Sequence, residues 1–187
     1  MAKHHLIVDG YNVIRQTQPY LDIVERDDWD SAREALIADV AASLQPSHHA
    51  TIVFDGTANP LSTGVPERRH GVIVIFSPHG LTADSVVERI ARESREHAEL
   101  VEVVTSDAQT QWAVLGERVV RRSSREFGER LESEAAERAD ALASQGQARK
   151  STLLDRVSPE ARAALEALRM SGRPGQRDRG EGSGSGD

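Results

Sequence analysis

Cysteine is absent from the 187-residue chain, and aromatic residues make up only 4% of it. Without cysteine the protein has no disulfides and no thiolate metal ligands. The same absence is compatible with the cytoplasmic location that we expect. Few aromatic residues argue against an extended platform on which RNA bases would stack. Long hydrophobic runs are also missing. The longest, residues 72–76, is far too short to cross a bilayer, so we expect no membrane partner.

Basic residues are fewer than acidic ones, and the formal net charge is -7. This balance argues against a nucleic-acid binder, because such proteins usually carry a basic footprint. Charge can be segregated, however, and a cluster of carboxylates in an active site would also raise the acidic count. The chain is long enough for one domain with a tail, or for two small domains.

Short apolar runs alternate with segments of helical periodicity along the chain. The pattern predicts strands over residues 5–8, 50–54, 72–76, 100–105 and, at an edge, 118–122. It predicts helices over residues 29–44, 83–97, 109–115, 124–144 and 159–170. This alternation is typical of an α/β fold with a mainly parallel central sheet flanked by helices.

The domain organisation follows from the same pattern. We expect an α/β core over residues 4–124 and a helical extension over 125–170 that packs on the core. Residues 171–187 have no apolar side chains and many glycines. Such a composition cannot bury enough surface to fold, so we expect a disordered tail.

Acidic residues follow three of the predicted strands. Asp9, Asp55 and Asp107 each stand at a strand end, and Asp84 begins the helix after the third strand. In parallel sheets ligands bind at the carboxyl edge, where these side chains would converge. Converged carboxylates repel one another unless a cation lies among them. Mg²⁺ and Mn²⁺ prefer such oxygen ligands.

Each of these carboxylates also has a local explanation. Asp55-Gly56 is ordinary turn chemistry, Asp84 suits the N-terminus of a helix, and Asp107 can cap one. Convergence at one edge, with Asn12 on the turn after Asp9, is the more specific signal. Spacing alone leaves both readings open.

The motifs VDGYNVI, FDG, TADSVVERI and VVTSDAQTQW occur in this order, and a long charged helix follows. In this respect the chain resembles the YacP-like NYN domain proteins, bacterial members of the PIN-like nuclease group, over roughly residues 4–170. The resemblance implies a PIN-like α/β fold and a metal-dependent endoribonuclease, a hydrolase that uses Mg²⁺ or Mn²⁺.

The family motifs can be carried onto individual residues. They imply that Asp9, Asn12, Asp84 and Asp107 are catalytic, and that the three aspartates bind the metal. For a further acidic ligand, Glu88 is the candidate, one turn after Asp84, and Asp55 is the reserve. A carboxylate at position 12 would bind metal more tightly than the asparagine found there.

Arginines are the expected contacts for RNA, because their planar fork of donors suits phosphate. Four arginines fall within eight residues: Arg118, Arg121, Arg122 and Arg125. Further candidates are Arg15, near the proposed site in sequence, and the loop pair Arg68 and Arg69. The alternative is that these side chains form a solvated face or pair with neighbouring glutamates. The expected partner is RNA, free or presented on a ribonucleoprotein such as the ribosome.

Three rival functions remain. The first is an RNA- or ribosome-binding module with a weak or inactive metal site. The second is a phosphatase with Asp9 as nucleophile, although Tyr11 interrupts the usual DxD arrangement. The third is a dinucleotide enzyme, which the absence of a Gly-x-Gly-x-x-Gly loop after the first strand disfavours.

Overall fold

The computed structural model describes residues 4–26, 28–106 and 118–155. The chain divides into two compact units, residues 1–138 and 139–187. The first unit contains the sheet. Asp140, which serves below as a surface control, belongs to the second unit. The helices predicted over 109–115 and 159–170, and the tail from 171, lie outside the described residues.

Among the described residues, six strands form the central sheet, in the order β3-β4-β2-β1-β5-β6. The strands are β1 (His4–Asp9), β2 (His48–Phe54), β3 (Glu67–Arg69), β4 (Val72–Phe76), β5 (Leu100–Val104) and β6 (Val119–Arg122). All neighbours pair in parallel except β3 and β4. The predicted α/β class with a mainly parallel sheet is therefore confirmed.

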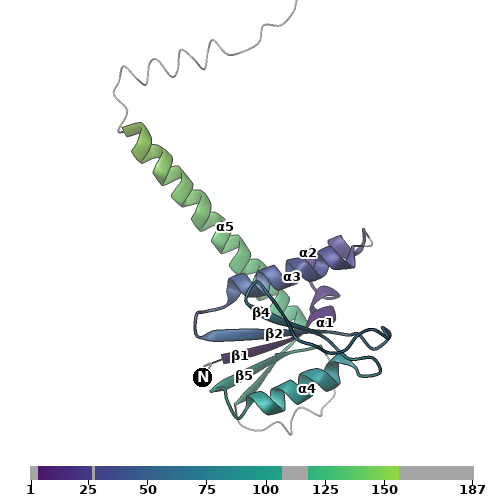
Figure 1. Cartoon of the computed structure of the whole chain (residues 1–187). Coiled ribbons are helices and arrows are strands. Elements are labelled where there is room, and N and C mark those ends of the chain that lie inside the picture. Colours follow the sequence, from purple (N-terminus) through teal and green to yellow (C-terminus); the bar gives the residue numbers. More distant parts are fainter. Residues whose placement is uncertain (1–3, 27, 107–117, 156–187) are drawn as a thin grey trace, which may run out of the picture. The chain divides into compact units, whose positions relative to one another are not determined.

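The described ranges contain five helices: α1 (Gly10–Ile14), α2 (Gln18–Val24), α3 (Trp29–Ser43), α4 (Ala83–Ser94) and α5 (Ser124–Asp155). Helices α1–α3 cover one face of the sheet and α4 covers the other (Figure 1). Asp28 caps α3 by accepting a bond from the Ser31 amide, and Thr82 caps α4 through Ser85. None of the helices in the described ranges combines the length and the hydropathy needed to cross a bilayer.

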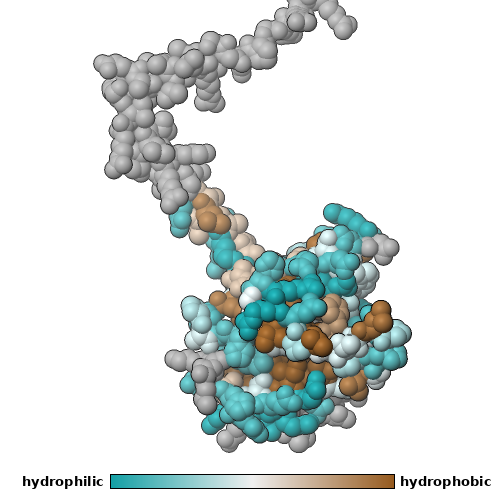
Figure 2. Space-filling model, viewed as in Figure 1, coloured by the Kyte–Doolittle hydropathy of each residue, from teal (hydrophilic) through white to brown (hydrophobic). Residues whose placement is uncertain are grey.

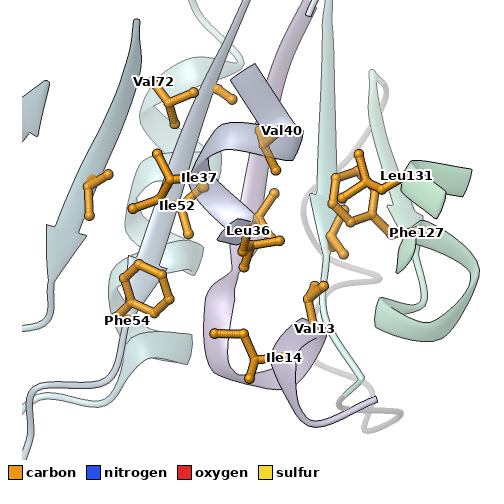
Figure 3. Close-up of a cluster of buried hydrophobic side chains, with 14 of the residues drawn as sticks. Val13, Ile14, Leu36, Ile37, Val40, Ile52, Phe54, Val72, Phe127 and Leu131 are labelled. Atoms are coloured by element: carbon orange, nitrogen blue, oxygen red, sulfur yellow. The ribbon is translucent and has the colours of Figure 1, made fainter. Parts of the chain in front are cut away.

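The two faces of the sheet have different cores. Leu6 and Val8 of β1 point to the face covered by α1–α3, whereas Ile7 between them points to the face covered by α4. The first face contains the larger cluster, to which α5 contributes Phe127 and Leu131 (Figure 3). Every strand residue near the centre is therefore buried, which explains the continuous apolar runs in the sequence.

Four elements differ from the sequence prediction. No strand was predicted between residues 54 and 72, but Glu67–Arg69 pairs with β4 across a tight turn in which His70 and Gly71 both have positive φ. Helices α1 and α2 were not predicted, because each is too short to show a periodic stripe. Helix α5 continues to Asp155 instead of ending near residue 144.

The position of β1 fixes the place of the site. The chain leaves β1 through α1–α3 to reach β2 on one side, and it reaches β5 on the other side from β4 through α4. The carboxyl end of β1 is thus the switch point of the sheet, where open α/β sheets bind ligands. The last residue of β1 is Asp9.

Candidate active site

Asp9 is a buried carboxylate held in a fixed orientation. Its side chain is 5% exposed. The backbone amide of Asn12 donates to Oδ1 at 3.1 Å, and the side-chain Nδ2 of Asn12 donates to Oδ2 at 2.8 Å. The sequence Asp-Gly-Tyr-Asn folds in this way because Asp9 is the N-cap of α1, which places position 12 one turn above it. Asn12 is therefore a positioning residue for Asp9.

Gly10 is required by the packing beneath this turn. A Cβ at position 10 would lie 2.3 Å from the ring of Phe54, which is fully buried on the neighbouring strand. The glycine allows α1 to begin directly at the strand end. It thereby allows Asp9 to be both the last residue of β1 and the cap of α1.

The electrostatics of Asp9 show that other carboxylates are near. Burial raises the pKa of Asp9 to about 6, against the opposing effect of the Asn12 amide. The negative charges of Asp84 and Asp55 raise this pKa further, whereas the positive charge of Arg15 lowers it. The structure thus brings Asp9, Asp55 and Asp84 to one edge of the sheet, from three different elements.

Asp55 has a structural role at this edge. Its Oδ1 accepts a bond from the Thr57 amide at 2.9 Å, and its Oδ2 accepts one from the Ala83 amide at 3.2 Å. Partial desolvation raises the pKa of Asp55, but the bonds from Thr57 and Ala83 and the charge of Arg15 lower it below its usual value. Asp55 therefore connects the end of β2 to the start of α4, one residue before Asp84.

The donor set fits a hard divalent cation in its chemistry, because buried and mutually repelling carboxylates favour one. Within residues 4–26, 28–106 and 118–155, however, no three histidine or acidic side chains lie close enough together to hold a metal ion. Asp107 lies outside the described residues. Gln16 at the end of α1 donates a hydrogen bond to Ser106, so the residue before Asp107 lies beside the same edge.

Glu88, the candidate for a further ligand, is half-buried on α4 and forms an ion pair with Arg92 at 3.1 Å. It is not among the groups whose charges shift the pKa of Asp9. Asp84 is the residue of α4 that does so, and it lies in the first turn, closest to the sheet edge.

The predicted RNA-binding arginines lie at two different edges. Arg15 ends α1 at the acidic edge, where its guanidinium lies 5.7 Å from the ring centre of Tyr11. Arg125 follows β6 at the start of α5 and lines a cavity together with Arg15. Arg15 is exposed and acts electrostatically on Asp9, whereas Arg125 forms an ion pair with Glu129 at 3.0 Å.

Among the other arginines, Arg121 lies near the carboxyl end of β6, opposite Val103, and the rest lie at the far edge or are paired. Arg68 and Arg69 pair with the first residues of β4, roughly 13 Å along the strand from the acidic edge, and Arg69 forms ion pairs with Glu34 and Glu67. Arg118 precedes β6 at the same far edge. Arg121 is exposed on β6, and Arg122 pairs with the buried Glu102.

The described part of the molecule contains at least two cavities. One, of about 510 Å³, lies between α4 and the sheet at the far edge and includes His5, whose two ring nitrogens bond Ser94 and Thr51. The other, of about 430 Å³, contains Arg15 and therefore adjoins the acidic edge. Sequence reasoning missed this second cavity, because residues 16–18 belong to no recognisable motif. Figure 2 shows that hydrophobic residues interrupt the hydrophilic surface on the face that it presents.

The fold is an α/β domain whose mainly parallel sheet carries carboxylates at its switch point. The chain belongs to the YacP-like NYN domain family, whose model matches residues 6–170. It is 33% identical over 131 residues to the uncharacterized protein YacP of Bacillus subtilis (strain 168), which covers 68% of this chain and 75% of that protein. The resemblance expected from the motifs is thereby confirmed.

Solved structures agree with this assignment. The crystal structure of Rae1 (YacP) from Bacillus subtilis matches with a TM-score of 0.56 and 29% identity, over 88% of this chain and 94% of that one. A tryptophan-to-leucine variant of the same protein matches with a TM-score of 0.61 and 27% identity, over 88% of this chain and 99% of that one.

Proposed function

We propose that the protein is a metal-dependent endoribonuclease that hydrolyses phosphodiester bonds within RNA. One observation carries the proposal: Asp9 is buried at the switch point of the sheet, with two further carboxylates near enough to raise its pKa. A carboxylate kept in such surroundings is a marker of a functional site. Membership of a family with a nuclease-like fold supports the same reading.

Asp9, Asp84 and Asp107 are the residues that would hold Mg²⁺ or Mn²⁺. Such an ion, when bound, supplies water activation and charge stabilisation for phosphodiester hydrolysis. Asn12 would keep the Asp9 carboxylate in one orientation through its two hydrogen bonds. A fixed ligand requires little reorganisation when substrate arrives.

Arg15 would hold the phosphate beside these carboxylates. Its charge already lowers the pKa of both Asp9 and Asp55, which places it within electrostatic reach of each. The side chain is exposed, and contact with the ring faces of Tyr11 and Trp29 restricts its position. A guanidinium presented in this way suits a bidentate contact with phosphate.

The test is cleavage of an end-labelled, mixed-sequence single-stranded RNA with Mn²⁺, with Mg²⁺ and with EDTA. We expect internal cuts that require the metal and that fall at least about 100-fold in Asp9→Asn, because losing even an outer partner of a metal ligand costs up to that much. Asp140→Asn removes the same charge from the exposed surface of α5 and should cut normally. Equal cutting by both variants would refute the assignment of Asp9.

A second candidate function is RNA binding without cleavage, on the same fold. It is favoured by the lack of three clustered metal-binding side chains among the described residues. Under this alternative the protein would bind RNA or a ribonucleoprotein such as the ribosome, and metals would neither bind at micromolar concentration nor produce cuts. Calorimetric titration with Mn²⁺, run beside the cleavage assay, separates the two candidates.

A further inference from the structure

The cavity of about 430 Å³ beside the acidic edge has the features of a built binding site. Residues 15–18, which join α1 to α2, form one wall, and Leu21 of α2 extends it. The opposite wall consists of three charged residues from the first turns of α5, Arg125, Glu129 and Glu132. All of these residues belong to the first compact unit.

The two walls are held together by a close contact. Thr17 packs against Gly128 of α5 so tightly that a Cβ at position 128 would lie 2.0 Å from the threonine Oγ1. Thr17 is the N-cap residue of α2 but does not cap it through its side chain. It is 3% exposed, and its hydroxyl has no hydrogen-bond partner in the described part of the chain. The buried Oγ1 abuts Gly128, so this contact fixes the spacing of the two walls.

The cavity is continuous with the proposed catalytic edge. Arg15 belongs to both, since it lines the cavity and acts electrostatically on Asp9. Gln16, the next lining residue, donates its hydrogen bond to Ser106 at the end of β5. A nucleotide in this cavity would therefore neighbour the phosphodiester bond at Asp9.

Arg15 and the two glutamates lie in different parts of the cavity. Arg15 stands at the end that adjoins the carboxylate edge, where a phosphate would lie. Glu129 and Glu132 stand on one face of α5, three residues apart. Glu129 pairs with Arg125 at 3.0 Å, and both side chains are mostly exposed, so the pair is weak and a ligand can replace it readily. Glu132 supplies the second carboxylate.

A carboxylate selects among the four bases by their hydrogen-bond donors. Guanine presents two adjacent donors, N1–H and the 2-amino group, which match the two oxygens of one carboxylate. Adenine and cytosine present one amino donor beside an acceptor nitrogen, and uracil presents one N–H between two carbonyls. Reading an unstacked base along this edge is the usual way in which proteins recognise single-stranded RNA.

We propose that this cavity binds a guanine nucleotide of the RNA next to the cleaved bond, with Glu132 accepting both donors of the base and Arg15 contacting the phosphate. The inference rests on the proposed function for its role in cleavage, but the binding itself does not require catalysis. It assigns a substrate preference to a region with no family motif.

Binding is tested by fluorescence anisotropy with labelled uridine pentanucleotides whose central base is guanine, hypoxanthine or adenine, in EDTA so that no cleavage occurs. We expect guanine to bind about tenfold more tightly than hypoxanthine, which lacks only the 2-amino group, and more tightly still than adenine. Glu132→Gln should abolish the difference. Glu137→Gln, which removes a charge from an exposed position on the same helix, should preserve it. Equal binding of all three oligonucleotides, or no binding of any, would overturn the proposal.

Mapping of the cuts in a long RNA by sequencing gives a second readout. Cuts by the wild type should cluster beside guanosines, and cuts by Glu132→Gln should not. Cleavage without any base preference would refute this inference and leave the nuclease intact. Guanine-selective binding without cleavage would refute the nuclease and leave the cavity's assignment intact.

Discussion

Replacing Asp9 by asparagine is expected to make the metal-free protein more stable at neutral pH. The carboxylate is 5% exposed, and its pKa rises from a usual 3.8 to about 6. Because the folded state favours the protonated acid, the unfolded chain ionises first as the pH rises. Stability contributed by the protonated form is therefore complete below about pH 3.8 and lost as the pH passes through about 6.

The size of this loss follows from the same values. The gap between 3.8 and about 6 corresponds to about 3 kcal/mol of unfolding free energy. Asparagine avoids the loss but has one oxygen where the carboxylate has two, so one of the two bonds from Asn12 is lost, at about 1 kcal/mol. The variant should thus be about 2 kcal/mol more stable than the wild type at pH 7.5, and about equally stable at pH 4.5.

Urea denaturation in EDTA at the two pH values measures the difference directly. Asp140→Asn, at an exposed position of α5, is the matched control and should change stability by less than about 0.5 kcal/mol at either pH. The reasoning is refuted if Asp9→Asn is less stable than the wild type at pH 7.5, or if its advantage does not grow between pH 4.5 and 7.5. Adding Mn²⁺ should then stabilise the wild type and not the variant.

Four further substitutions test the packing of the described residues. Gly10→Ala should lower the unfolding free energy by about 1–3 kcal/mol in urea denaturation, because its Cβ would overlap the buried ring of Phe54. Gly128→Ala should lose a similar amount, and Thr17→Ala in that background should restore part of it, which a double-mutant cycle would detect. Glu102→Gln should cost about 2 kcal/mol, because this 4% exposed carboxylate pairs with a histidine and two arginines; an unchanged melting temperature would show that the cluster is dispensable.

The sheet could be predicted because its strands are continuously apolar. Residues such as Ile7 and Val53 are buried on one face while Leu6 and Ile52 are buried on the other, so each strand forms a run that the sequence displays openly. Strand β3 was missed for the opposite reason. Its residues, Glu-Arg-Arg, are exposed or half-buried and pair only because β4 offers a free edge.

Candidate site residues were predictable where they depend on strand ends alone. Asp9 ends β1 in both the prediction and the structure, and Asp84 stands in the first turn of α4 as expected. The sequence could not show which arginines lie at the acidic edge and which lie at the far edge, because their positions depend on strand register. Register places Arg68 opposite Ile73, near the start of β4, and a local pattern cannot contain that information. Asp55 was ambiguous in sequence, and its bonds to Thr57 and Ala83 assign it a structural role.

The instability of Asp9 is itself an argument about function. A buried carboxylate that weakens the fold by a few kcal/mol at neutral pH could be replaced easily, since asparagine or serine carries no charge to bury. Gly10 instead lets Asp9 stand buried at the switch point, and Asn12 orients the carboxylate through two hydrogen bonds. A cation bound as proposed would recover the lost free energy, because the attraction between cation and carboxylate increases as water is excluded. On the proposed function, the affinity for metal and the metal-free instability are therefore two measures of one interaction. Variants that relieve the instability at Asp9 should lose metal affinity in proportion.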